Sequence, residues 1–159
     1  MMVRCGSISM SAIAAAMVLA GCTDETTGSE ETLTLTEVDK GSHFAPIGNA
    51  DAQGHEPPGS GFALSIPLQD SSHDTVGEIN AVCIATRPAS SEPVLSGTCT
   101  GTADAPDGQL ALIAGGDEIG QDVTGAIVGG TDKYEGATGT FSSKSPGPNT
   151  IDTFNITLP

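Results

Sequence analysis

The chain has no tryptophan and one tyrosine, and only 5 of its 159 residues are lysine or arginine. Against these stand 20 aspartate and glutamate residues, which give a formal net charge of -15. A protein of this charge repels phosphate groups and has no cationic surface from which counterions could be released, so we expect no nucleic-acid partner. The same charge would keep an exported domain soluble.

Helix-like periodicity is also missing. From residue 32 onward, no stretch shows apolar residues at helical spacing, whereas alternation with a period of two recurs between clusters of Gly, Pro, Asp and Ser. The 21 glycines and 10 prolines are typical of such a turn-rich β protein. Hydrophobic residues make up 37% of the chain, which predicts a small core of Val, Ile, Leu and the four Phe.

The usual catalytic motifs are absent from the sequence: there is no Gly-x-Ser-x-Gly elbow, phosphate loop, His-Glu-x-x-His or dinucleotide fingerprint. His43, His55 and His73 show no ligand spacing with the cysteines, so we expect solvated histidines and no zinc site. A group of acidic residues matches no calcium loop and is better explained by turn chemistry: Asp104, Asp107, Asp117 and Glu118. We therefore expect neither a metal nor another cofactor.

The first residues have the form of an export signal. Arg4 is followed by an apolar run over residues 8–19, which is long enough for a signal peptide but short for a membrane span. The next residues, Leu19-Ala20-Gly21-Cys22, resemble the lipobox of bacterial lipoproteins. The resemblance implies cleavage before Cys22, a diacylglyceryl group on its sulfur, and a membrane-anchored lipoprotein that faces the extracytoplasmic side of the bacterial cell envelope. In the alternative, an ordinary secretory signal, Cys22 is incidental.

Three regions follow from this interpretation: a signal peptide at 1–21, a flexible acidic tether at 22–31, and one β domain at 32–159 with a long loop at 39–61. The tether is small, polar and acidic, so it has nothing to bury. The loop is unusually long for a compact domain. Such loops are often functional covers, and a disordered surface excursion is the alternative.

Two cysteines remain in the predicted mature domain, Cys83 and Cys99. They lie symmetrically about Ser91, and a hairpin that turns at residues 88–93 would set them opposite each other with their side chains on one face. In an oxidising compartment such a pair is most simply a disulfide. The alternative is a pair of buried thiols.

Eight segments of the domain are predicted to be strands: 32–38, 62–68, 76–86, 94–103, 109–114, 122–128, 137–143 and 150–158. The connections between them are mostly short, which favours antiparallel pairing of successive strands. Eight such strands form either a closed up-and-down barrel or a sandwich, and closure removes both sheet edges.

The link between the sixth and seventh of these segments is rich in glycine. Its sequence, Gly129-Gly130-Thr131-Asp132-Lys133-Tyr134-Glu135-Gly136-Ala137-Thr138-Gly139-Thr140-Phe141, resembles the Gly-Gly-Thr-Gly-x-Phe/Tyr-x-Gly-Ala-x-Gly signature of the allene oxide cyclase barrel-like and dirigent-like families. The similarity covers roughly residues 60–158. Asp132 replaces the usual glycine, which is tolerable because Asp adopts left-handed conformations readily.

This resemblance implies an all-β fold, an eight-stranded antiparallel up-and-down barrel. In that barrel the link is a closing motif formed by Gly129, Gly130, Thr131, Tyr134, Gly136, Ala137, Gly139 and Phe141. The two glycines permit a sharp turn, and the Tyr134 ring can lie across a barrel end. The motif carries no catalytic group of its own.

Three functions are compatible with such a barrel. The first is a lipid-anchored module that holds a small apolar ligand in its lumen. The second is a cyclase or isomerase that steers an apolar substrate by positioning it, which needs no acid–base motif. The third is a structural lipoprotein whose barrel is filled by its own side chains. Glu78 is a catalytic candidate if its strand face lines the lumen, and otherwise it faces water. The sequence leaves a homo-oligomer open.

Overall fold

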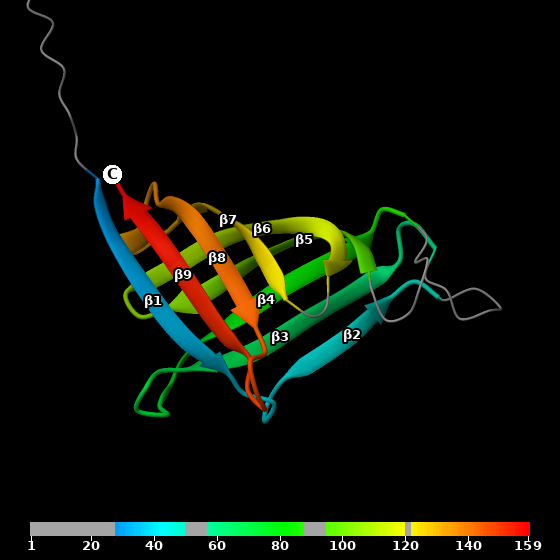
Figure 1. The fold of residues 1–159 in the computed structure, drawn as a ribbon, viewed down its shortest axis with the longest axis horizontal. Coiled ribbons are helices and arrows are strands. Elements are labelled where there is room, and N and C mark those ends of the chain that lie inside the picture. The colour runs from blue at the N-terminus through cyan, green and yellow to red at the C-terminus, as the bar shows by residue number, and fades with distance from the viewer. Residues whose placement is uncertain (1–27, 50–56, 88–94, 120–121) are drawn as a thin grey trace, which may run out of the picture.

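The computed structural model describes residues 28–49, 57–87, 95–119 and 122–159 (Figure 1). Within these ranges the chain is almost entirely β structure. The elements are β1 (Ser29–Glu37), β2 (His43–Ile47), β3 (Gly61–Gln69), β4 (Thr75–Ala85), β5 (Leu95–Ala105), β6 (Gly108–Ile119), β7 (Val123–Gly130), the 3-10 helix η1 (Asp132–Tyr134), β8 (Thr138–Lys144) and β9 (Ile151–Leu158). None of the described residues belongs to a helix with the length and hydrophobicity needed to span a membrane.

The strands form one antiparallel sheet that closes on itself. Their order is β1-β9-β8-β7-β6-β5-β4-β3-β2, and β1 also pairs with β3. The closing seam is short, since it consists of the pairs Thr36↔Gln69 and Glu37↔Leu68. Eight strands therefore make the ring, and β2 lies outside it on the edge of β3 (Figure 1). The predicted eight-stranded antiparallel barrel is confirmed.

Period-two alternation determines which side chains face the interior. Residues directly opposite in an antiparallel pair share a face, so the register traces inward positions from strand to strand. One such row consists of Leu33, Phe154, Phe141, Gly125, Ala114, Cys99, Cys83 and Phe62. Phe154 and Phe141 follow Leu33 at one end of this row and Phe62 lies at the other, while small side chains line it across β4 to β7.

The disulfide lies within this row. Cys83 pairs directly with Cys99 in the register of β4 and β5, and the two residues are joined by a disulfide with their Cα atoms 4.0 Å apart. The cross-strand disulfide and its hairpin register are therefore confirmed. Both cysteines belong to the buried core.

Two boundaries differ from the prediction. The loop at 39–61 contains a strand, β2, which pairs with β3 through Phe44↔Leu64 and neighbouring residues. It satisfies backbone groups on the part of β3 that the short seam leaves unpaired. In addition, β1 begins at Ser29 rather than 32, because the end of the predicted tether pairs with the last residues of β9.

The glycine-rich link caps one end of the barrel. Tyr134 is only 2% exposed, and its hydroxyl donates a hydrogen bond to the Pro106 carbonyl at 3.0 Å. Asp132 has a φ of 54°, the left-handed conformation expected for a residue in place of glycine. The motif nevertheless does not join the edges of the sheet, because closure takes place between β1 and β3. Its role as the closing link is corrected to that of an end cap.

Candidate functional site

Two acidic side chains interrupt the apolar interior. Glu37 ends the inward series Leu33, Leu35, Glu37 on β1, and Asp152 begins the inward series of β9. The register sets Leu35 opposite Asp152 and Asp152 opposite Ser143. Three neighbouring strands therefore bring two carboxyl groups and one hydroxyl together, beside the seam that closes the barrel.

The hydrogen bonds of this cluster are incomplete. The Ser143 hydroxyl donates to Oε1 of Glu37 at 3.3 Å. Asp152 has an exposed fraction of 0%, and among the described residues no donor hydrogen-bonds to either of its oxygens when the group is ionised. An ionised carboxylate without a donor is costly inside a protein, whereas a protonated one can donate to its neighbour. The geometry therefore favours one proton shared between Asp152 and Glu37.

The electrostatics agree with this assignment. Burial, together with the negative charge of Glu37, raises the pKa of Asp152 from 3.8 to about 7. Burial also raises the pKa of Glu37 above 4.5, while hydrogen bonds from Ser143 and Asp152 oppose that rise. Two carboxyls that share a proton titrate as a unit. Near neutral pH the Glu37–Asp152 pair therefore contains one acid and one base.

An apolar wall on β3 extends from the pair along the interior. Leu68, which faces Glu37 across the seam, is fully buried. Further along the same face, Ile66, Leu64 and Phe62 pack against the core but remain partly exposed. This part of the inner surface is therefore not fully covered by other side chains.

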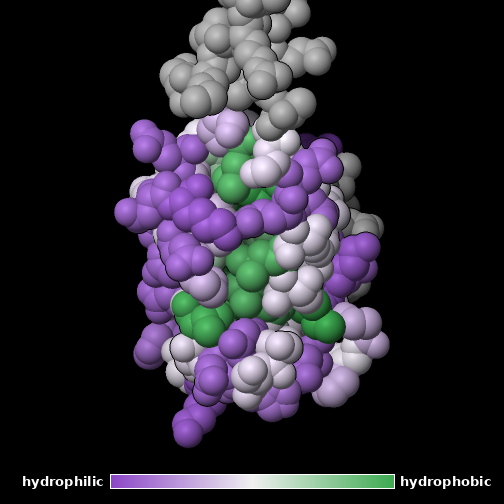
Figure 2. All heavy atoms as spheres, turned by 90° about the vertical axis from the view of Figure 1, so that its left-hand side faces the viewer, coloured by the Kyte–Doolittle hydropathy of each residue, from purple (hydrophilic) through white to green (hydrophobic). Residues whose placement is uncertain are grey.

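Two more observations show apolar atoms at the surface of the protein. The ring of Phe44 on β2 stacks on Phe62 with centroids 4.9 Å apart and is itself 67% exposed. On the end of the barrel seen in Figure 2, hydrophobic atoms show between hydrophilic side chains. Partly buried residues that pack against the core include Leu33 of β1 and Leu158 of β9.

This arrangement suits general acid–base chemistry. A carboxylic acid with a raised pKa can donate a proton near neutral pH, and a carboxylate beside it can accept one. The apolar surroundings maintain the difference between the two groups. They also provide a surface for a substrate with little charge.

The residues singled out from the sequence lie elsewhere. Glu78 stands between the inward positions of Gly77 and Ile79, so its side chain is on the outer face of β4. There it accepts hydrogen bonds from Ser65 at 3.2 Å and Asn80 at 2.8 Å. Glu78 therefore does not meet the condition for a catalytic role, which was a place in the lumen. It lies on the outer face, the other position considered for it, and is held there in a local polar network.

The histidines do not contribute to the cluster as far as the structure describes them. His43 and His73 are exposed, as expected, and His55 lies outside the described residues. Within the described ranges, no group of three or more His, Cys, Asp or Glu side chains is arranged to hold a metal ion.

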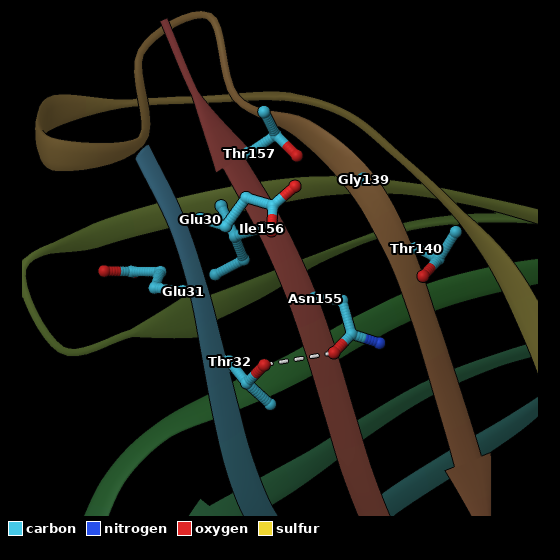
Figure 3. Close-up of a pocket in the computed structure, with 8 residues that line it drawn as sticks. All are labelled: Glu30, Glu31, Thr32, Gly139, Thr140, Asn155, Ile156 and Thr157. Atoms are coloured by element: carbon cyan, nitrogen blue, oxygen red, sulfur yellow. Dashed lines mark hydrogen bonds between the residues drawn. The ribbon is translucent and has the colours of Figure 1, made fainter. Parts of the chain in front are cut away.

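A second concave region lies on the outside of the barrel, across β1, β9 and β8 (Figure 3). It has a volume of about 290 Å³ and is lined by Glu30, Glu31, Thr32, Gly139, Thr140, Asn155, Ile156 and Thr157. Thr32 donates to the Asn155 side-chain oxygen at 3.1 Å within it. Glu31 is already paired with Lys133 at 2.9 Å. The groove is open and polar and lacks a buried acid, so the interior is the better candidate.

Comparison with solved structures identifies the architecture. A pyocyanin demethylase superposes with a TM-score of 0.64 at 18% identity, covering 79% of this chain and 99% of its own. A pterocarpan synthase dirigent protein gives 0.56 at 18% identity, with coverage of 82% and 90%. A Diels-Alderase from Streptomyces koyangensis gives 0.57 at 14% identity, with coverage of 84% and 71%. This is the dirigent-like barrel fold.

The resemblance seen at the glycine-rich link is thus confirmed at the level of the fold. No family model and no curated protein sequence matches the chain. At these identities a shared dirigent-like barrel does not transfer an activity, so the function must be argued from the residues of this chain.

Sequence reasoning missed the Glu37–Asp152 pair, although each residue left a signal. In both strands an acid occupies a position that the period-two series assigns to the interior: Glu37 after Leu33 and Leu35, and Asp152 before Phe154 and Ile156. A carboxyl that continues an apolar series at a strand end is easily taken for a solvated terminus. Only the pairing of β1 with β9 shows that the two acids meet.

Proposed function

We propose that this protein is a cyclase or isomerase that binds an apolar molecule against the inner wall of the barrel. The observation that carries the proposal is the buried Glu37–Asp152 pair, which combines an acid and a base in apolar surroundings. The ligand-holding module favoured by the sequence requires the same wall but gives the pair no role. The barrels named as a Diels-Alderase and a dirigent protein support the catalytic alternative.

The chemistry conserves atoms and protons. Glu37, the member of the pair that a substrate can reach, removes a proton from one atom of the substrate and delivers a proton to another, while the buried Asp152 holds the shared proton and exchanges it with Glu37. The product is then an isomer of the substrate. Delivery of that proton leaves Glu37 ionised and Asp152 protonated, as before the reaction, and the apolar wall keeps water away from the intermediate.

The proposal is tested by incubating the full chain with lipophilic cell extract in heavy water and following mass-resolved products. The wild-type chain should convert a compound into an isomer of equal composition that carries one solvent deuterium. Asp152→Asn and Glu37→Gln should each reduce this conversion by about a hundredfold or more, as expected for loss of a general acid or base. Glu78→Gln, which removes an outer carboxyl, should leave it unchanged. Equal conversion by wild type and Asp152→Asn would refute the mechanism.

We further propose that the barrel is anchored to the extracytoplasmic side of a bacterial membrane through a lipid on Cys22. The lipobox-like sequence supports this, and so does the Cys83–Cys99 disulfide, which is typical of an oxidising compartment. Cys22 itself lies outside the described residues. In this arrangement the enzyme would meet apolar compounds close to a membrane surface.

A further inference from the structure

The Glu37–Asp152 pair leaves a charge in the interior that the described residues do not balance. Asp152 is fully buried, and within the described part of the chain its carboxyl oxygens have no hydrogen-bond partner besides the proton shared with Glu37. The one ion pair formed between described residues joins Lys133 to Glu31, away from the pair. With one shared proton, the pair carries about one negative charge.

Among the described residues no cationic side chain faces the pair: Lys144 of β8 follows the inward Ser143 and is exposed on the outer face. On β3 and β7 the facing residues, Leu68 and Val123, are apolar, and on β8 Ser143 offers a hydroxyl that already donates to Glu37. On β1 and β9 the titratable groups facing this point are the pair itself. Asp39, just beyond the end of β1, contributes further negative charge. A ligand at this site therefore meets an unbalanced anion.

We propose that the substrate is an apolar molecule with one protonatable nitrogen, which donates an N–H hydrogen bond to the Glu37–Asp152 pair. This inference rests on the proposed function, because it names the class of substrate for the same site. A protonated nitrogen supplies a hydrogen-bond donor to the oxygen lone pairs that the shared proton and Ser143 leave free, and it supplies the missing positive charge. A hydroxyl supplies only the donor, and a carboxylate supplies neither. The net charge of -15 also favours the approach of cations over anions.

The geometry of the wall suggests how such a molecule lies. Glu37 is only partly buried, whereas Asp152 lies behind it with no exposed surface. The nitrogen therefore reaches Glu37 first. The apolar body then rests along Ile66 and Leu64, the partly exposed residues beyond the seam on β3.

Three probes of similar size separate charge from shape: naphthylmethylamine, naphthylmethanol and naphthoate. The full chain has no tryptophan, so naphthalene fluorescence can be followed without an indole background. We expect the amine to bind about tenfold to a hundredfold more tightly than the alcohol, the range for a hydrogen bond between charged groups. We expect naphthoate to bind most weakly. The amine should also bind more tightly as the pH rises and the pair loses its shared proton, while the alcohol should not.

Matched variants locate the effect. Asp152→Asn and Glu37→Gln should each reduce the preference for the amine, whereas Glu78→Gln should retain it. The preference should survive added salt, since buried charges are screened much less than surface charges. Circular dichroism establishes that each variant is folded, and the two substitutions test the pair independently.

The outcomes distinguish this inference from the proposed function. Equal binding of the amine and the alcohol would overturn the nitrogen-bearing class while leaving an apolar substrate in place. An amine preference that persists in both Asp152→Asn and Glu37→Gln, or disappears in salt, would assign it to the acidic surface and overturn the inference. Failure of all three probes to bind would count against the inference and the binding wall together.

Discussion

Replacing Asp152 with asparagine should make the protein more stable at alkaline pH. Moving the pKa of this carboxyl from 3.8 in the unfolded chain to about 7 in the folded protein means that folding takes up a proton between these values. The contribution of the Asp152 carboxyl to the free energy of unfolding is fully present below pH 3.8 and is lost as the pH rises through about 7. Between about pH 5 and about pH 8, the free energy of unfolding of the wild type should fall by about 3 kcal/mol because of this group.

Asp152→Asn removes this titration and retains a side chain that can donate to Glu37. At pH 8 the free energy of unfolding of the variant should therefore be about 4 kcal/mol higher than that of the wild type. This difference corresponds to about 10 °C in melting temperature. Denaturant unfolding followed by circular dichroism at the two pH values measures the difference. Glu78→Gln removes the same charge on the outer face and corrects for general repulsion in an acidic protein. If Asp152→Asn loses as much stability as the wild type between the two pH values, the titration does not belong to Asp152, and the raised pKa of its carboxyl is contradicted.

Three further predictions concern the cap, the disulfide and the anchor. Gly130→Ala should lower the free energy of unfolding by about 1 to 3 kcal/mol, because an added Cβ would lie 2.5 Å from a backbone oxygen. Gly129→Ala should change it by less than about 1 kcal/mol, because an added Cβ there would have no atom within 4 Å. Equal losses would contradict the packing of the cap. Replacing Cys83 and Cys99 together with serine should cost about 3 kcal/mol in denaturant unfolding, and an unchanged midpoint would show that the disulfide does not constrain the chain. Cys22→Ala should move the protein from the membrane fraction to the soluble fraction, and retention in the membrane would contradict lipidation.

The strands could be predicted because alternation along one segment directly reports which face is buried. Phe62, Leu64, Ile66 and Leu68 show this in a single stretch. The barrel could be predicted from the glycine-rich link, because the turn at this point requires glycines and so leaves a recognisable local sequence. β2 escaped because it is an edge strand that contains Pro46 and pairs on one side only, so its sequence does not have to alternate.

The acid pair depends on information that no local stretch contains. Glu37 and Asp152 lie near opposite ends of the chain, and each taken alone resembles a charged residue at a strand terminus. Their juxtaposition follows from the register of β1 on β9 and from the seam with β3. For Glu78 the local pattern was misleading: the polar face of β4 indicated a candidate, but the register shows that this face lies outside the barrel.

The placement of β1 has a consequence for biosynthesis. The first strand of the barrel lies between β9 and β3, so the ring cannot close until β9 has emerged from the ribosome. The intervening strands each pair with the strand made just before, and such local contacts form early and quickly. The N-terminal strand must wait for a partner more distant than any other in the sequence. A nascent or truncated chain can thus possess most of its sheet while Glu37 and Asp152 remain apart, and the acid–base pair comes into being only with the final strand.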